Sequence, residues 1–369
     1  MKNWYDIENI EDVDSPSIVL YEENLMYNLH EILAMAGGEV SMLMPHVKTN
    51  KMPKVIGLMI SLGVKNFKAS TIAEAEIAAK EGADGVLIAH QLVGPKIKRF
   101  GALTKRFPNT CFTTIIDNLD SAKRMNDEAI EQNVIIGIYI DINSGMNRSG
   151  IELGLQLDEL IIQINNLNNL NLSGLHVYDG HLRDPDFQKR KDQIESGLQP
   201  ITVLFQTLKK ANPNLHLICG GTPSFTSHIH EADRISSPGT CLFWDWGYNE
   251  KLTEQDFKYA ALLICRVISK PTAGIVTIDL GHKSVASENP IHQRVKFLNL
   301  DDYQLLSQSE EHGVLKVANW EQLSVGDVFY GVPYHICPTI NLHDEVSVIR
   351  NNKKMDTWNI TARRRKISV

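Results

Sequence analysis

Short hydrophobic runs alternate with longer amphipathic runs from residue 17 to about residue 245. The run "SIVLY" (17–21) precedes "EENLMYNLHEILAMA" (22–36), and "EVSMLMPHVKT" (39–49) precedes "MPKVIGLMISLG" (52–63). The same alternation continues through the apolar runs at 66–70, 85–90, 111–117, 134–143, 172–179 and 215–221, and "RISSPGT" (234–240) closes the series. Strands that alternate with helices of this length indicate βαβ units and a parallel sheet. About eight such units favour a (β/α)8 barrel of the TIM type over a doubly wound sheet.

The pattern changes past residue 255. Runs such as "YAALLICRVISK" (259–270) and "VFYGVP" (328–333) are short strands separated by turn residues, and "VGD" before the second is a tight-turn signal. The sequence therefore predicts an N-terminal segment (1–16) that joins the β domain, a barrel (17–250), and a mainly antiparallel C-terminal β domain (251–369).

Composition and charge narrow the function classes. The chain has 369 residues, 43% of them hydrophobic and 22% charged, which is ordinary for a globular enzyme of two domains. A net charge of −7 argues against a nucleic-acid partner, and the short basic run "ARRRK" (362–366) is interpreted as a solvated or interface segment. No apolar run approaches the roughly 20 residues of a membrane helix, so no membrane partner is expected. The acidic N-terminus lacks a signal-peptide pattern and the five cysteines are scattered, which predicts a cytoplasmic protein.

In a barrel of this type, chemistry gathers at the carboxyl ends of the strands. The chemistry-bearing positions there are His46, Lys48, 69–71, His90, Gln91, Asp117, 141–148, 176–181, 220–222 and 237–240.

Lys48 lies in "MPHVKTNK" (44–51), at the end of a run that looks buried. A lysine there is either a Schiff-base lysine, activated by desolvation and nearby cations, or a surface lysine with a partly buried stem. The octapeptide alone leaves both interpretations open.

Two glycine turns follow the last two predicted barrel strands. "CGGTPSF" (219–225) contains Gly220, Gly221 and Thr222, and "SPGT" (237–240) contains Gly239 and Thr240. Glycines let backbone N–H groups approach an anion, and the loops after strands 7 and 8 of barrels often bind phosphate. Together the two turns predict a phosphate site, although each one singly is only a turn.

Arg148, His176 and Tyr178 are candidate contacts of a ring-shaped ligand. Arg148 follows "IYIDIN" in a glycine loop, where its guanidinium could bind a phenolate or carboxylate oxygen. Strand alternation places His176 and Tyr178 on the same side of "GLHVYD". The alternatives are a solvated arginine and a core tyrosine with a satisfied hydroxyl.

His335 and Cys337 are spaced i, i+2 in "PYHICPT" (333–339). In a strand this spacing puts both side chains on one face, and imidazole with thiolate suits zinc or another borderline metal. Two donors are a weak signal, because a buried cysteine beside a core histidine is the commoner arrangement.

The motifs "MPHVKTNK", "GMNRSG", "YDGH", "GGTP", "SPGT" and "YHICPT" occur here in one order. That ordered set resembles the D-threonine aldolase and D-serine dehydratase family, whose members are fold-type III pyridoxal-phosphate enzymes built like alanine racemase. The resemblance extends from "DSPSIVLY" to "TARRRK", nearly the whole chain.

The resemblance implies a role for each candidate residue. Lys48 would carry pyridoxal 5'-phosphate covalently, Arg148 would contact its phenolic oxygen, and Tyr178 would approach its pyridine nitrogen, with His176 beside the ring. The phosphate would be held by the two turns, through Gly220, Gly221, Thr222, Gly239 and Thr240. His335 and Cys337 would bind a divalent metal that acts as a Lewis acid on the substrate's β-hydroxyl; the thiolate favours zinc over manganese or magnesium.

Three positions depart from the family pattern. Met44 stands where relatives usually have arginine, and Asn50 replaces a frequent histidine. Cys337 stands where the aldolases tend to have aspartate and the dehydratases cysteine. The third departure bears on the reaction more than on the fold.

The resulting hypothesis is a pyridoxal-phosphate- and metal-dependent lyase of β-hydroxy D-amino acids, which cleaves them to glycine and an aldehyde. Its alternative is a D-serine dehydratase that releases ammonia and pyruvate. An amino-acid racemase and a non-catalytic pyridoxal-phosphate-binding protein are further alternatives. Such folds usually pair symmetrically, which predicts a homodimer.

Overall fold

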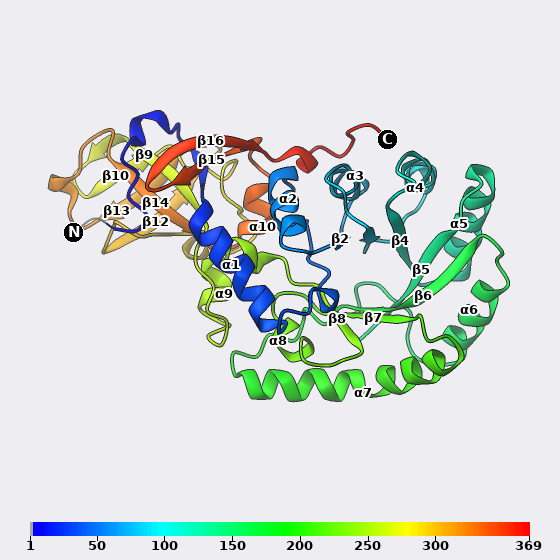
Figure 1. Cartoon of the computed structure of the whole chain (residues 1–369). Coiled ribbons are helices and arrows are strands. Elements are labelled where there is room, and N and C mark those ends of the chain that lie inside the picture. The colour runs from blue at the N-terminus through cyan, green and yellow to red at the C-terminus, as the bar shows by residue number, and fades with distance from the viewer. Residues whose placement is uncertain (1–2) are drawn as a thin grey trace. The chain divides into compact units, whose positions relative to one another are not determined.

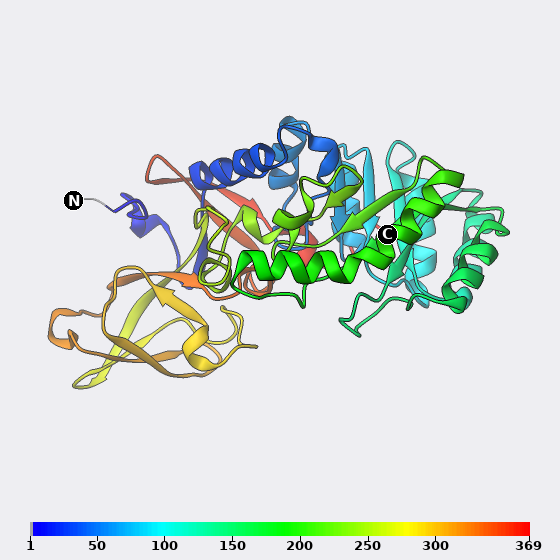
Figure 2. The ribbon, with the colours of Figure 1, turned by 90° about the horizontal axis from the view of Figure 1, so that it is seen from below.

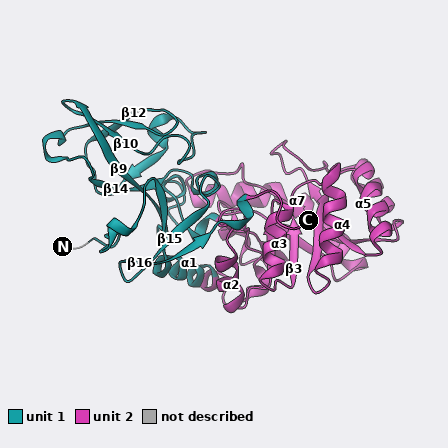
Figure 3. Cartoon of the chain, turned by 90° about the horizontal axis from the view of Figure 1, so that it is seen from above, with its two compact units in different colours: residues 1–32, 240–363 teal, residues 33–239, 364–369 magenta. Residues whose placement is uncertain are grey.

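The computed structural model describes residues 3–369. The chain divides into two compact units, one formed by Met1–Ile32 with Thr240–Arg363, and the other by Leu33–Gly239 with Arg364–Val369 (Figure 3). Each unit has its own sheet. No helix in the described part of the chain has the length and apolarity needed to span a membrane.

The second unit is built on a parallel sheet of seven strands among the described residues, paired in chain order from β2 to β8. The strands are β2 (Asn66–Ala69), β3 (Gly85–Ile88), β4 (Cys111–Ile116), β5 (Ile136–Ile142), β6 (Leu170–Val177), β7 (His216–Cys219) and β8 (Arg234–Ser236). Neighbouring strands are joined by helices, as the alternation of patterns predicts. The helices are α2 (Pro53–Ser61), α3 (Ile72–Lys80), α4 (Pro95–Arg106), α5 (Leu119–Gln132), α6 (Leu155–Asn165), α7 (Phe187–Ala211) and α8 (Phe225–His228).

Local sequence signals explain where these helices begin. The side chains of Thr71, Asn118 and Asp186 each accept a backbone N–H in the first turn of α3, α5 and α7. Helices α2 and α4 instead begin with a proline, whose missing N–H costs nothing at that position. Helices α3 to α6 lie along the outer side of the strands (Figure 1), and α7 is the long green helix in Figure 2.

The eighth position of the barrel is occupied by a segment that is not a regular strand. The run 39–49, predicted as a strand, begins with a 3-10 helix (Val40–Met42), and residues 43–47 then cross between the two edge strands. On one side Met44 N–H donates to Ser236 O (2.8 Å), and on the other Val47 N–H donates to Lys68 O (2.9 Å). Pro45 lacks an N–H, which prevents a continuous ladder, but its carbonyl accepts from Lys68 N–H (3.0 Å). Residues 43–47 therefore close the parallel sheet into a ring. This irregular closing segment lies directly before Lys48.

The first unit contains a mainly antiparallel sheet of nine strands among the described residues, in which β12-β13-β10-β9-β1-β15-β16 are neighbours and β14 joins β11 to β9. Its strands are β1 (Ser17–Tyr21), β9 (Ala261–Thr272), β10 (Ile275–Ile278), β11 (Val295–Phe297), β12 (Tyr303–Gln308), β13 (Gly313–Val317), β14 (Val328–Pro333), β15 (Glu345–Arg350) and β16 (Lys353–Asn359). Short helices α9 (Trp246–Asn249) and α10 (Ile336–Ile340) belong to the same unit, and α1 (Glu22–Met35) begins in it.

The prediction that "SIVLY" opens the barrel is wrong. Strand β1 pairs antiparallel with β9 and parallel with β15, and it belongs to the nine-stranded sheet. Four of its five residues are buried, as in a barrel strand. A short buried apolar run indicates a strand but not its partner, so the pattern could not distinguish the two sheets.

Candidate active site

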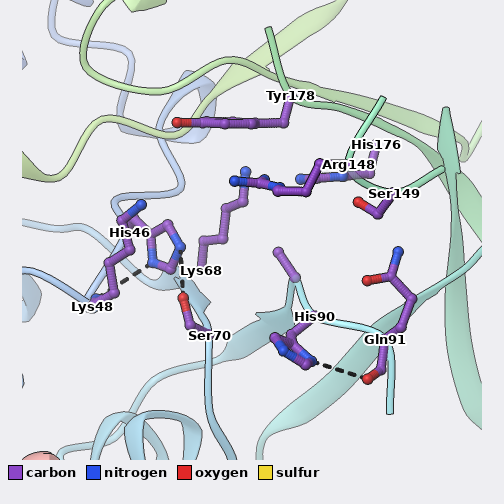
Figure 4. A pocket seen from close by; sticks show the side chains of 11 residues that line it. His46, Lys48, Lys68, Ser70, His90, Gln91, Arg148, Ser149, His176 and Tyr178 are labelled. Carbon is purple, nitrogen blue, oxygen red and sulfur yellow. Dashed lines mark hydrogen bonds between the residues drawn. The ribbon is translucent and has the colours of Figure 1, made fainter. Parts of the chain in front are cut away.

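A pocket of about 400 Å³ opens at the carboxyl ends of the parallel strands (Figure 4). Its walls come from the closing segment, from β2 and β6, and from the residues that follow β2, β3, β5 and β6. The lining residues are His46, Lys48, Lys68, Ser70, Ala89, His90, Gln91, Arg148, Ser149, His176 and Tyr178. Four sequence-predicted residues (Lys48, Arg148, His176 and Tyr178) thus meet in one cavity, and His176 and Tyr178 share a side of their strand as the alternation predicts.

Lys48 is held by a turn that a buried ion pair fixes. Lys51, at φ +54°, forms an ion pair with Glu74, whose side chain is fully buried. The second oxygen of Glu74 accepts Ser70 N–H at 2.6 Å. Glu74 therefore connects the turn after Lys48 with the turn after β2, and both line the pocket.

Three cations surround the ring of Tyr178. Lys48 Nζ lies 6.0 Å from the ring centroid, Lys68 Nζ 5.9 Å, and Arg148 Cζ 4.9 Å. None of the three forms an ion pair with a carboxylate within residues 3–369. Cations can be attracted to an aromatic face, but that attraction does not neutralise three charges. The pocket therefore has an excess of positive charge.

His176 is buried and faces the pocket with one ring nitrogen. Its Nδ1 lies 2.7 Å from Asp141 Oδ1, and Asp141 Oδ2 accepts hydrogen bonds from Gln91 (2.8 Å) and Ser149 (2.9 Å). Burial raises the pKa of Asp141, but these hydrogen bonds outweigh it and hold that pKa below its usual value. Burial and the charge of Lys68 lower the pKa of His176, against the opposing effect of Asp141. Its Nε2 has no hydrogen-bond partner among the described residues.

The two glycine turns lie beside the pocket and are bonded to each other. Gly239 N–H donates to Thr222 Oγ1 at 3.1 Å. A Cβ at Gly239 would lie 2.7 Å from His46 O, so this position needs glycine for close approach, and a Cβ at Gly221 would lie in tight contact, 3.1 Å, with the Tyr178 ring. Gly221 N–H donates to Ser224 Oγ (3.3 Å), which means that an anion at these turns would compete with hydroxyl acceptors. The Ser237 hydroxyl in the second turn is buried and has no partner within the described chain.

A buried polar chain supports the first glycine turn from below. Asp179 accepts a hydrogen bond from Ser224 Oγ (2.5 Å) and lies 2.7 Å from His228 Nε2. Arg234 then joins His228 (3.4 Å) to Glu195, with which it makes two bonds of 2.5 and 2.8 Å. Although burial raises the pKa of Asp179, the interactions with His228 and Ser224 lower it overall. Sequence reasoning missed His228 and Arg234, because His228 lies in α8 and Arg234 begins β8, whereas chemistry was expected at the carboxyl ends of the strands.

Comparison with known families identifies the chain. The "Alanine racemase, N-terminal domain" model matches residues 21–245, and a "Putative serine dehydratase domain" model matches residues 260–349. The first match covers more than half of the chain. The protein belongs to the alanine racemase N-terminal domain family.

Relatives within this family match the chain nearly end to end. D-threonine aldolase of an Arthrobacter species is 26% identical over 362 residues, which cover 95% of this chain and 93% of the relative. The 3-hydroxy-D-aspartate aldolase of Paracoccus denitrificans is 24% identical over 367 residues, with coverages of 95% and 92%. The resemblance indicated by the ordered motifs is thereby confirmed.

Solved structures of family members share the fold. The D-threonine aldolase of Filomicrobium marinum superposes with a TM-score of 0.86 at 24% identity, covering 98% of this chain and 99% of that one. The D-threo-3-hydroxyaspartate dehydratase of a Delftia species superposes with a TM-score of 0.78 at 19% identity, with coverages of 96% and 98%. The predicted arrangement of a barrel followed by a mainly antiparallel domain is confirmed.

Pyridoxal phosphate is the cofactor that the alanine racemase-like family implies, and the residues of the pocket fit it. Three cations without carboxylate partners suit a ligand with several anionic groups. The unpaired His176 Nε2 lies in the pocket wall, and the unpaired Ser237 hydroxyl lies in the adjoining glycine turn. A ligand that hydrogen-bonds there would satisfy polar groups that are costly to leave buried and unpaired.

His335 and Cys337 lie in the first unit, and their local structure differs from the prediction. His335 is the N-cap of α10 rather than a strand residue, so the i, i+2 argument from a shared strand face is wrong. The two side chains still meet: burial lowers the pKa of His335, but hydrogen bonding with Cys337 and contact with Glu288 raise it to about 9. His335 Nδ1 lies 2.7 Å from Glu288 Oε1. Thr240, predicted as a phosphate ligand, has its Oγ1 3.2 Å from Cys337 Sγ.

The donor set at this pair is small. Among residues 3–369, no group of three or more His, Cys, Asp and Glu side chains is arranged to hold a metal ion. A zinc site takes three or four protein ligands, or fewer with water or substrate in the open positions. His335 and Cys337 therefore fit a metal only as part of a set that other ligands complete.

Lys68 is a charged pocket residue that sequence reasoning missed. It is the third residue of β2, inside a run ("NFKAS") that reads as a buried strand. Burial and the charge of Lys48 lower its pKa to about 7. The signal that could have found it is a lysine in the interior of a short barrel strand, where a charge is rarely buried without a partner.

Proposed function

We propose that this protein is a pyridoxal-phosphate- and divalent-metal-dependent lyase that cleaves β-hydroxy D-amino acids to glycine and an aldehyde. The observation that carries the proposal is the pocket itself, in which Lys48 and two further cations surround Tyr178 without carboxylate partners. It is supported by relatives named D-threonine aldolase and 3-hydroxy-D-aspartate aldolase, each of which matches 95% of this chain.

Each pocket residue has a role in this proposal. The amine of Lys48 would hold the cofactor. When bound, pyridoxal phosphate supplies a ring that accepts the electron pair left by the breaking bond at Cα. The ring of Tyr178 and the unpaired nitrogen of His176 position that ring, and Arg148 donates hydrogen bonds to its phenolic oxygen. By orienting the substrate in the pocket, these side chains would select which bond at Cα reacts.

The two glycine turns are the proposed phosphate site. Thr222 and Thr240 supply hydroxyl groups, Ser237 supplies one that has no partner among the described residues, and Gly220, Gly221 and Gly239 allow close approach. The chain from Asp179 to Glu195 keeps the first turn in place beneath the phosphate. The carboxylate of Asp179, paired with His228, supports the turn and is not itself exposed to the anion.

His335 and Cys337 are the proposed ligands of the divalent metal, which would supply Lewis acidity to the substrate's β-hydroxyl group. The thiolate favours zinc over manganese or magnesium. In the aldolase reaction, a base removes the hydroxyl proton and the Cα–Cβ bond breaks.

D-serine dehydratase activity is the second candidate. Cys337, where the aldolases tend to have aspartate, favours it, and the serine dehydratase domain model covers this part of the chain. In that reaction Lys48 would take up the Cα proton, hydroxide would leave from Cβ, and the resulting enamine would react with water to give ammonia and a 2-oxo acid.

A product assay on the purified protein with pyridoxal phosphate separates the two. We expect aldehyde and glycine from D-threonine or 3-hydroxy-D-aspartate, and loss of that activity after treatment with a chelator, restored by zinc or manganese. Ammonia and pyruvate from D-serine, with no aldehyde from D-threonine, would replace the first candidate by the second. No turnover of any β-hydroxy D-amino acid would contradict both.

A further inference from the structure

Lys68 is a buried lysine in the pocket wall that has no carboxylate partner in the part of the chain that the structure describes. Its residue is 3% exposed, and its Nζ reaches to 5.9 Å from the centre of the Tyr178 ring. Nowhere in residues 3–369 does a carboxylate lie within ion-pair distance of it. Burying an ammonium group without a counter-charge is costly, so its retention in a pocket points to a ligand that supplies the charge.

The buried carboxylates nearby are committed to other groups. Asp141 binds His176, Gln91 and Ser149, and Asp179 binds His228 and Ser224. The charges of Asp141 and Asp179 raise the pKa of Lys68. Burial and the charge of Lys48 lower that pKa by more, so the net shift is downward. Neither carboxylate lies within ion-pair distance of Lys68 in the described part of the chain, so the partner is not supplied there.

The ligands already proposed for the pocket leave one anion without a cation. Lys48 binds the cofactor covalently, Arg148 serves its phenolic oxygen, and the glycine turns serve its phosphate. An amino-acid substrate brings at least one carboxylate, and Lys68 is the remaining cation around Tyr178. Figure 4 shows Lys68 between the Lys48 and His46 side and the Arg148 and His176 side of the pocket.

We propose that Lys68 binds a carboxylate of the amino-acid substrate. The inference rests on the proposed function in taking pyridoxal phosphate and an amino acid as the ligands of this pocket, but not on which lyase reaction follows. For D-threonine or D-serine the anion is the α-carboxylate. For a 3-hydroxyaspartate it is either the α-carboxylate or the side-chain carboxylate, and Lys68 would then help to select the substrate.

This role makes binding sensitive to pH. Burial and the charge of Lys48 lower the pKa of Lys68 to about 7, so the ammonium form predominates below pH 7 and is lost as the pH rises above it. A bound carboxylate favours the ammonium form, and binding above pH 7 therefore takes up a proton. The charged and titratable groups around Lys68 are Lys48, His46, Asp141, Asp179, Cys219, His176 and Arg148.

The test measures binding of three non-reacting amines to the pyridoxal-phosphate-loaded protein by the change in cofactor absorbance. D-alanine carries an α-carboxylate, D-aspartate carries a second one, and ethylamine carries none. Since none has a β-hydroxyl group, the measurement does not depend on the lyase reaction. In Lys68→Met, affinity for D-alanine or D-aspartate should fall roughly 10- to 100-fold, the loss of one charge-assisted hydrogen bond, while affinity for ethylamine stays unchanged.

The pattern of losses identifies the carboxylate. Equal losses for D-alanine and D-aspartate assign Lys68 to the α-carboxylate, and a loss for D-aspartate alone assigns it to the side-chain carboxylate. Lys68→Arg should retain most of the preference for carboxylates. Lys65→Met, which changes an exposed lysine directly before β2, should alter none of the three affinities.

Two results would overturn the proposal. One is an equal loss for all three amines, which would make Lys68 a cofactor-binding residue; the other is no loss for any. If Lys68→Met fails to fold or to bind the cofactor, a measurement on the wild-type protein still tests the proposal. Its affinity for D-alanine relative to ethylamine should decrease from pH 6 to pH 9, because the ratio removes the shared protonation of the amines, and a constant ratio would contradict the role of Lys68.

Discussion

Three lysines at the barrel mouth show how surroundings give one residue type different properties. Lys51 is neutralised by the buried carboxylate of Glu74 and fixes a turn. Lys68 is buried without a counter-charge, so its pKa falls to about 7. Lys48 is only partly buried and stands at the pocket, where its amine is accessible to a ligand. Of the three, only Lys48 both lines the pocket and directly precedes the turn that the Lys51–Glu74 ion pair fixes.

Replacing Lys48 by alanine tests the covalent attachment at this scale. Lys48→Ala should give no borohydride-fixed adduct with pyridoxal phosphate, and lyase turnover should fall at least about 100-fold, because both the attachment point and a proton carrier are lost. Mass spectrometry of the reduced protein and the product assay measure the two effects.

Lys54→Ala provides the matched control, since Lys54 is an exposed lysine in the same stretch of the chain. It should keep the adduct and the activity, with an unchanged circular dichroism spectrum in both variants. A borohydride-fixed adduct that persists in Lys48→Ala would contradict the assignment.

At the level of elements, the turn after β7 requires glycine at position 220 for two reasons: the backbone conformation and the lack of space for a Cβ. Gly220 has φ +66°, and a Cβ there would lie 2.6 Å from Ser224 Oγ and 2.7 Å from His228 Cδ2. Those two side chains hold Asp179 beneath the turn. The β7–α8 connection, its buried polar chain and the adjoining turn after β8 therefore act as one structural element.

Gly220→Ala should lower the free energy of unfolding by more than the backbone strain of the substitution alone. The left-handed conformation costs about 1–2 kcal/mol for a residue with a Cβ. The clash with Ser224 and His228 should add to that loss in the free energy of unfolding and should weaken pyridoxal-phosphate binding. Denaturant unfolding and a cofactor titration measure the two quantities.

The control Gly82→Ala distinguishes the effect of backbone strain from the effect of a steric clash. Gly82 has φ +97°, but a Cβ there would meet no atom within 4 Å, so this variant should lose only the backbone contribution and keep its cofactor affinity. If Gly220→Ala bound the cofactor as tightly as Gly82→Ala, the turn would not be part of the phosphate site.

At the level of the whole molecule, the chain is assembled from two units that each use distant parts of the sequence. The nine-stranded sheet joins β1 near the N-terminus to strands beyond residue 260, and the C-terminal residues return to the parallel unit. There Arg99 Nη2 donates to the carbonyls of Arg365 (2.8 Å) and Val369 (2.9 Å). The basic run that the sequence left as a solvated or interface segment is thus divided between the two units at Arg363.

We expect the protein to form a homodimer, because oligomeric enzymes most often associate with twofold symmetry. Light scattering after size-exclusion chromatography should give about twice the chain mass of 41.5 kDa over a wide range of protein concentrations. A mass of one chain at every concentration would contradict the homodimer.

The sequence by itself determined the features that depend on local patterns. The change from helix–strand alternation to short strands near residue 255 predicted a parallel sheet and a mainly antiparallel one. The ends of apolar runs placed Lys48, Arg148, His176 and Tyr178 where one pocket forms. Such features are readable because hydrophobic periodicity records which face of an element is buried, and because strands of a parallel sheet all end on the same side.

Only the tertiary structure decided the features that depend on partners. Strand β1 pairs in the nine-stranded sheet, and Pro45 makes the eighth segment of the barrel irregular. Lys68 lies close to other cations rather than to a carboxylate. The physical reason is that burial is encoded locally, whereas hydrogen-bond partners and the charges around a side chain are set by segments far away in the sequence. His228 and Lys68 therefore became recognisable only when the strands that carry their neighbours were in place.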